Sequence, residues 1–184
     1  MGSKLVRYSV RSFLKMKVIG KCVRTKDGVG LDDSTITDLW ESITHDGSLD
    51  FLLTLPDRLT QSLDTVGWMG DFVPGNADYT YLAGVLVQPD AIVPEGFVSR
   101  DLDACDMAVG WIAETEGDDG GDMMANASAH LGAANQEHGY EYDGSHGFFE
   151  MEYYSEERFR SPKARGEPVT LDFYSPCKKI DPTS

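Results

Sequence analysis

The residues best suited to chemistry lie in one alternating segment near the end of the chain, residues 147–154. Successive side chains of a β-strand point to opposite faces. Four side chains that could contact a ligand should therefore share one face: Phe148, Glu150, Glu152 and Tyr154. The two carboxylates would lie roughly 7 Å apart along the strand. Because aromatic rings beside a carboxylate attract cations, the segment predicts a site for a cationic or aromatic small molecule.

The same alternation is typical of a sheet face that is open to water, and the pattern alone leaves both interpretations open. On the other face of the strand, Phe149, Met151 and Tyr153 have the character of core residues. Further aromatic side chains in other predicted elements are candidates for the same pocket: Trp40, Trp68, Tyr79, Tyr81, Trp111 and Tyr174. Each of them, taken singly, is more often a core residue.

Hydrophobic patterns predict the elements that must position these residues. Strands are expected at residues 13–24, 63–72, 79–87, 107–114, 147–154 and 168–174, and amphipathic helices at 32–43 and 122–137. The turn-forming residues 73–77 make a hairpin of the second and third strands. The order is strand, helix, strand, strand, twice over. This layout predicts an α+β fold with helices covering one face of each half-sheet and a cleft where the halves meet.

The remaining segments carry weaker patterns. Residues 1–12 show no clear period and residues 181–184 are polar, so both are expected to be loosely held. Residues 155–167 are expected to be a polar connection between the last two strands. We therefore expect an N-terminal extension, 1–12, and a single domain, 13–180, with approximate halves 13–98 and 99–180.

The composition argues against several classes of partner. The formal net charge is -15, so a phosphate backbone would be repelled and direct nucleic-acid binding is not expected. No apolar run approaches the roughly 20 residues of a membrane span, and no membrane partner is expected. The three cysteines are far apart and without CxxC spacing, which favours a reducing, cytoplasmic setting.

Three other patterns have residue types that could form a site. His130, His138 and His146 recur every eight residues, but Gly132 and Gly139 argue against one helix face, and surface histidines are the better interpretation. The acidic run 114–122 lacks the ligand spacing of an EF-hand loop. Cys177 has no neighbouring base in the sequence and is expected to be an inert buried thiol. No metal and no cofactor are expected.

Several motifs together resemble those of the gyrase-inhibitor-like (GyrI-like) small-molecule-binding family. They are ITDLW (36–40), YTYLAGV (79–85), VPEGF (93–97), GYEY (139–142), FEMEYY (149–154) and VTLDFYSP (169–176). The resemblance spans about residues 13–177. It implies two strand-helix-strand-strand units related by a pseudo-twofold axis, with a ligand groove between them that holds a lipophilic or cationic aromatic compound.

The resemblance also implies which carboxylate matters. In the family, a glutamate on the penultimate strand sits among aromatic rings, and Glu150 is the matching position; Glu152 is assigned to the pocket by alternation alone. Binding of a small molecule is the first expectation. The alternative is hydrolysis of cyclopropane-containing alkylating natural products, with Glu150 as general base, helped by Glu152 or Glu114. Inhibition of a protein partner such as gyrase is a remote third.

Overall fold

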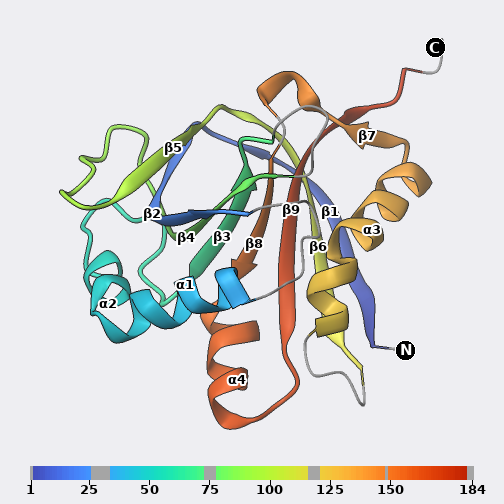
Figure 1. Ribbon diagram of the computed structural model, residues 1–184. Coiled ribbons are helices and arrows are strands. Elements are labelled where there is room, and N and C mark those ends of the chain that lie inside the picture. Colours follow the sequence, from blue (N-terminus) through green and yellow to red (C-terminus); the bar gives the residue numbers. More distant parts are fainter. Residues whose placement is uncertain (1, 26–33, 73–77, 116–120, 148, 182–184) are drawn as a thin grey trace.

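The computed structural model describes residues 2–25, 34–72, 78–115, 121–147 and 149–181. The strands are β1 (Ser3–Phe13), β2 (Met16–Arg24), β3 (Thr65–Gly70), β4 (Thr80–Val87), β5 (Val98–Leu102), β6 (Cys105–Glu114), β7 (Tyr140–Tyr142), β8 (Glu150–Tyr154) and β9 (Thr170–Lys179). The α-helices are α1 (Ser34–His45), α2 (Ser48–Leu52), α3 (Gly121–Glu137) and α4 (Ser161–Arg165). A short 3-10 turn, η1 (Gly144–His146), and a π-helical turn, η2 (Glu156–Arg160), complete the fold (Figure 1).

The strands form one antiparallel sheet in the order β1-β6-β9-β8-β3-β4-β2-β5, with β7 paired to the end of β9. Its two halves repeat one arrangement, since β2, α1, β3, β4 and β6, α3, β8, β9 follow the same order along the chain. In the sheet the second set runs β6-β9-β8 and the first runs β3-β4-β2, so each strand has its counterpart across the junction of β8 and β3. The predicted α+β fold and its strand, helix, strand, strand order are confirmed.

The sheet is strongly curved. Only two residues separate the end of β1 from the start of β2, yet these strands lie near opposite edges of the sheet. The concave interior is filled by a cluster of buried side chains from both halves, including Val66, Trp68, Met107 and Met151. Figure 1 shows β2 and β5 arching over toward the end of β1. This cluster holds the two halves of the sheet together.

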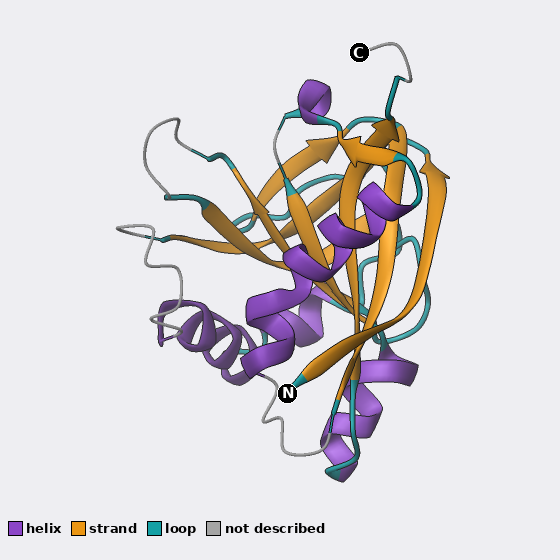
Figure 2. Ribbon diagram, turned by 90° about the vertical axis from the view of Figure 1, so that its right-hand side faces the viewer, coloured by secondary structure: helices purple, strands orange, loops and turns teal. Residues whose placement is uncertain are grey.

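All the long helices pack on the other face. Residues directly opposite each other in antiparallel strands point the same way, and one such row is Ala83, Gly67, Glu152 and Phe173. Ala83 packs in the cluster of α1, while Phe173 packs in the cluster of α3. The two helices therefore flank Glu152 on a common face of the sheet. Figure 2 shows the helices in purple against the strands in orange.

Helix α3 rests on its strands through a stripe of small and medium side chains. Met123, Ala127, Leu131 and Ala134 are buried, as the sequence predicts for a helix at residues 122–137. Small residues on this stripe allow the helix axis to approach β6 and β9 closely. None of the described helices is both long enough and apolar enough to cross a membrane.

Two expectations are wrong, one for the N-terminal residues and one for the segment before the last strand. Of residues 1–12, residues 3–12 are not loosely held, because they belong to β1, which pairs with β6 on both sides of a bulge between Leu5 and Arg7. Residues 155–167 are not merely a connection, because they form η2 and α4. The sequence also gave no prediction for α2, β5 or β7. The predicted turn at 73–77, residues 32–33 of the first predicted helix, residues 116–120 of the acidic run and Phe148 lie outside the described residues.

Candidate functional site

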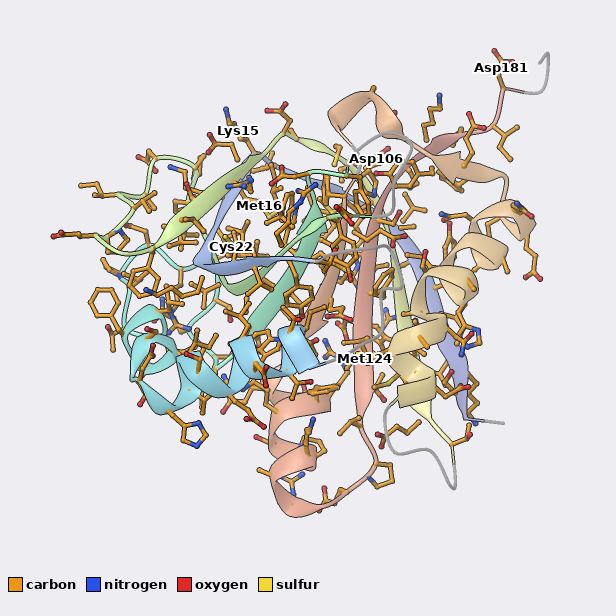
Figure 3. All side chains as sticks on the ribbon, in the orientation of Figure 1. Lys15, Met16, Cys22, Asp106, Met124 and Asp181 are labelled. Atoms are coloured by element: carbon orange, nitrogen blue, oxygen red, sulfur yellow. The ribbon has the colours of Figure 1, made fainter. Side chains whose placement is uncertain are left out.

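A cavity of about 1250 Å³ lies on the helix-covered face of the sheet, where the two halves meet. We call it the central cavity. Its walls come from α1, from the start of α3 and from the η2–α4 segment, and its floor comes from β3, β4 and β8. Met124, labelled in Figure 3, lines the wall that α3 provides. The aromatic side chains that line the cavity are Trp40, Tyr79, Tyr81, Tyr154 and Phe159.

Glu152 is the acidic residue at the floor of the central cavity. Glu152 is only 8% exposed. The hydroxyl groups of Tyr81 and Tyr154 both donate hydrogen bonds to its Oε2, at 2.7 and 2.6 Å. Two O–H donors on one oxygen form the short, charge-assisted bonds that stabilise a carboxylate anion. These two bonds favour the ionised form of the Glu152 carboxylate, which burial alone would disfavour.

The aromatic walls are tied to this carboxylate. The indole Nε1 of Trp40 donates to the hydroxyl of Tyr81 at 3.1 Å, so α1 is linked to the floor through the same network. The Trp40 ring meets the ring of Tyr154 edge-on at 5.3 Å, and Tyr154 meets Phe159 at 4.8 Å. Such edge-on pairs add to the stability of a cluster beyond the area they bury. A ligand would therefore meet a preformed aromatic surface.

Gly67 on β3 provides the room for this network. It lies directly opposite Glu152 in the neighbouring strand. A Cβ atom at this position would lie 1.9 Å from the hydroxyl oxygen of Tyr81 and 2.8 Å from Oε2 of Glu152. An isolated glycine in a strand often marks such a close approach. Any larger residue would displace the hydroxyl group that holds the carboxylate.

Burial sets the protonation of the two phenols. It is the largest cause that raises the pKa of Tyr81 and of Tyr154 well above the ordinary value of 10.0, and the neighbouring charge of Glu152 raises both pKa values further. Both phenols therefore stay protonated and act as donors over the physiological pH range.

The structure brings together only part of the predicted site. Glu152, Tyr154, Tyr81, Tyr79 and Trp40 line the central cavity. Glu150 points to the same side of the sheet but is not part of the cavity lining; its Oε1 accepts a hydrogen bond from the hydroxyl of Ser128 on α3, at 2.7 Å. Phe148 lies outside the described residues.

Three predicted aromatic residues lie on the opposite face of the sheet. Trp68 and Tyr174 belong to the cluster inside the curved sheet, and Trp111 packs against that cluster. The guanidinium groups of Arg7 and Arg158 lie over the Trp111 ring, at 4.5 and 4.4 Å from its centre. The expectation that these rings share the face of Glu152 is corrected, because strand pairing gives each of them the opposite orientation.

Sequence reasoning missed the wall that η2 and α4 provide. Phe159, Arg160 and Lys163 all line the central cavity, although the segment reads as a polar connection. The one signal in the sequence is Phe159, because a lone large apolar residue in a polar stretch usually packs against other apolar residues. In the structure Phe159 is only 6% exposed. His130 and His138 do not line the cavity: His130 contacts the hydroxyl of Ser3, and the ring of His138 stacks on Tyr8. Within the described residues, no three His, Cys, Asp or Glu side chains are grouped so that they could hold a metal ion.

Glu150→Gln is the control for substitution of Glu152, and the burial of Glu150 leads to a prediction about the stability of this variant. Burial raises the pKa of Glu150 above its ordinary value of 4.5, so its charged form is disfavoured in the folded state at neutral pH. Glu150→Gln is expected to leave stability at pH 7 unchanged or to raise it by up to about 1 kcal/mol. The gain should vanish below pH 4, where the carboxyl is protonated in both states. Urea unfolding at both pH values measures this, and a large loss at pH 7 would contradict it.

Comparisons with known proteins identify a family and related folds. Residues 14–176 match the family described as Cass2, integron-associated effector binding protein. The structure of SAV2435 bound to tetraphenylphosphonium is similar, with 12% identity, 94% of each chain covered and a TM-score of 0.64. So is the EcmrR C-terminal domain, with 12% identity, 95% of this chain and 98% of that chain covered, and a TM-score of 0.58.

A third similar structure is the integron cassette protein VCH_CASS2 from the mobile metagenome of Vibrio cholerae, with 12% identity, 96% and 99% of the two chains covered, and a TM-score of 0.52. At these identities the three structures establish the fold alone. No sequence among the curated proteins matches the chain.

Proposed function

Because the chain belongs to the Cass2 family of integron-associated effector-binding proteins, we propose that its central cavity binds a lipophilic aromatic small molecule and favours cations. One observation carries the proposal: the carboxylate of Glu152 is buried among aromatic rings at the floor of a cavity of about 1250 Å³. That volume is ample for a drug-sized ligand.

The chemistry of the lining supports a cation in particular. A cation over an aromatic face gains about 0.5 to 2 kcal/mol, and more when the site is desolvated. An opposite charge within the same water-poor space adds a Coulomb attraction that bulk water would screen. Glu152 and the rings of Trp40 and Tyr154 supply both contributions. The formal net charge of -15 would also raise the local concentration of cations.

Titration with tetraphenylphosphonium tests the proposal, because this compound is the cation in the similar SAV2435 structure. The neutral compound triphenylphosphine oxide serves as the control with similar rings. We expect saturable binding of the cation by calorimetry and at least about tenfold weaker binding of the neutral compound. At a hundred times its Kd the cation should stabilise the fold by about 2.7 kcal/mol. If neither tetraphenylphosphonium nor other cationic aromatics bind, the proposal fails.

Trp40 should report binding by its fluorescence. It is the tryptophan in the cavity lining, whereas Trp68 and Trp111 lie on the opposite face of the sheet. We expect tetraphenylphosphonium to change the emission of the wild-type protein and of Trp111→Phe, and the change to disappear in Trp40→Phe. Calorimetry should show that Trp40→Phe still binds, several-fold more weakly. A change that persists in Trp40→Phe but is lost in Trp111→Phe would locate the ligand elsewhere.

Hydrolysis of cyclopropane-containing alkylating compounds is the second candidate. Only the presence of carboxylates in the cavity favours it. Glu152 and the expected helper Glu114 line the cavity, as do Glu41 and Glu167, whereas Glu150 does not. Both phenol donors already engage Oε2 of Glu152, which suits a fixed negative charge better than a proton acceptor. Incubation with such a compound decides the matter by mass spectrometry. Ring-opened product that disappears in Glu152→Gln would establish catalysis.

A further inference from the structure

Two cationic side chains lie along one wall of the central cavity, on the segment formed by η2 and α4. Arg160 and Lys163 both line the cavity. Arg160 donates from Nη1 to the carbonyl oxygen of Leu63, and the Nζ of Lys163 lies 5.4 Å from the centre of the Phe159 ring. Among the described residues, no carboxylate forms an ion pair with either side chain. In a chain with a formal charge of -15, a half-buried guanidinium such as that of Arg160 needs an explanation when it has no ion-pair partner.

Two other acidic residues of the cavity lining are engaged by other groups. Glu167, which also lines the cavity, forms an ion pair with Arg165 at 2.6 Å. Oε2 of Glu114 accepts a hydrogen bond from the backbone N–H of Val169 at 3.0 Å. These bonds hold the two carboxylates at positions set by α4 and by the start of β9. Among the described residues, Arg160 and Lys163 therefore line the cavity without a carboxylate partner.

Two further acids act on Arg160 from a distance. Glu156 accepts from the backbone N–H of Leu63 through Oε2, at 2.8 Å, and Asp64 accepts from the hydroxyl of Tyr153 and from the backbone N–H of Glu156. Burial lowers the pKa of Arg160 despite the opposing influence of these acids and of Asp50. The guanidinium is therefore partly desolvated without a bonded anion, a state that a ligand anion would relieve.

The cationic wall is connected to the acidic floor by two rings. Oε2 of Glu152 accepts from the hydroxyl of Tyr154, the Tyr154 ring packs against Phe159, and Lys163 lies over Phe159. Opposite charges therefore stand at the two ends of one aromatic surface within a single cavity. A compound that lay along this surface could meet the carboxylate with one end and the ammonium with the other.

We propose that the ligand of the central cavity is amphoteric: an aromatic compound with a cationic group for Glu152 and an anionic group, such as a carboxylate, for Lys163 and Arg160. This inference rests on the proposed function and adds the second charge to it. Charge-assisted bonds from two cations to one carboxylate are stronger than neutral ones and fix the orientation of the ligand. The cavity would thereby discriminate against simple lipophilic cations of equal size.

A matched pair of probes tests the inference. (4-Carboxybutyl)triphenylphosphonium carries both charges, whereas its methyl ester carries the phosphonium charge alone. Calorimetric titration of the wild-type protein is expected to show at least about fivefold tighter binding of the acid than of the ester. The preference should shrink as salt rises, because an ion pair near the cavity mouth is screened. Lys163→Gln, and its combination with Arg160→Gln, should remove the preference, so that the acid binds no more tightly than the ester.

Lys179→Gln is the control, since it removes the same charge from an exposed residue at the far end of β9, outside the cavity lining. It should keep the preference for the acid. Equal binding of acid and ester to the wild-type protein, or a preference that survives both substitutions, would overturn the amphoteric ligand while leaving the proposed function intact. If neither probe binds, the proposed function itself fails and the inference fails with it. Because Lys163 is exposed, its single variant should fold even if the double variant does not.

Discussion

Replacing Glu152 with glutamine is expected to weaken the binding of tetraphenylphosphonium by about a hundredfold. Removing one partner of a desolvated charge pair typically costs 2 to 5 kcal/mol of binding free energy, roughly 30-fold or more. The substitution keeps the size of the side chain and its ability to accept from Tyr81 or Tyr154, so the loss reports the charge. Binding of neutral triphenylphosphine oxide should change by less than about threefold.

Glu150→Gln is the matched control for this experiment. It makes the same chemical change on the same strand and the same face, two residues away, but at a side chain bonded to Ser128 rather than in the cavity lining. Its affinity for tetraphenylphosphonium should stay within about twofold of the wild-type value. If Glu150→Gln lost binding while Glu152→Gln kept it, the family-based assignment of Glu150 would hold and the assignment of the site to Glu152 would fall.

Raising the pH above 10 is expected to destabilise the fold steeply. Burial is the main cause that raises the pKa of Tyr81, Tyr153, Tyr154 and Tyr174 above the ordinary value of 10.0. Below pH 10 these phenols are protonated in the folded and the unfolded state alike, so they add no pH dependence. Above pH 10 the unfolded chain loses these protons and the folded chain keeps them. The free energy of unfolding therefore falls as pH rises, by about 1.4 kcal/mol per pH unit for each such tyrosine.

Urea unfolding at pH 8, 10 and 11 measures this effect. Tyr174→Phe is the matched variant, because Tyr174 is buried in the cluster inside the curved sheet and its removal deletes one titrating group. Above pH 10, the free energy of unfolding should fall less steeply with pH in the variant than in the wild-type protein, by about 1.4 kcal/mol per pH unit. Constant stability of the wild-type protein from pH 8 to pH 11 would mean that these tyrosines ionise in the folded state.

The elements that could be predicted are those with a strong period. The helix at residues 32–43 and the hairpin around β3 and β4 are found close to their predicted limits, because apolar side chains there recur at the helical or strand spacing. β1 was missed for the opposite reason. It is an edge strand with charged residues such as Arg7 and Arg11 along it, so its apolar residues do not alternate cleanly.

Alternation predicts which side chains of β8 share a face of the sheet. It does not predict which side chains of neighbouring strands lie on that same face. Phe149 and Met151 mark the buried face of their own strand, and the structure confirms that Glu152 and Tyr154 lie on the other. The prediction for Trp68 was wrong because the register between strands decides which of their residues lie on the same face of the sheet. A shift of one residue in that register moves every side chain of a strand to the other face. No local pattern in the sequence carries that register.

The choice between the two glutamates also depends on tertiary structure. Both lie on one face, as alternation predicts, but α3 covers Glu150 through Ser128, while Glu152 lies in the space between α1 and α3. The positions of the helices decide which carboxylate a ligand can reach. By contrast, the resemblance to the GyrI-like family is confirmed, because it depends on motifs spread along the chain rather than on one position.

A crystal structure of the complex with tetraphenylphosphonium tests the central claim most directly. The account predicts that the phosphonium lies in the central cavity, against the rings of Trp40 and Tyr154, with Glu152 as its nearest carboxylate. A cation–π contact would bring the charge to within about 6 Å of a ring centre. A phosphonium bound nearest to Glu150, or on the opposite face of the sheet beside Trp111, would contradict the account.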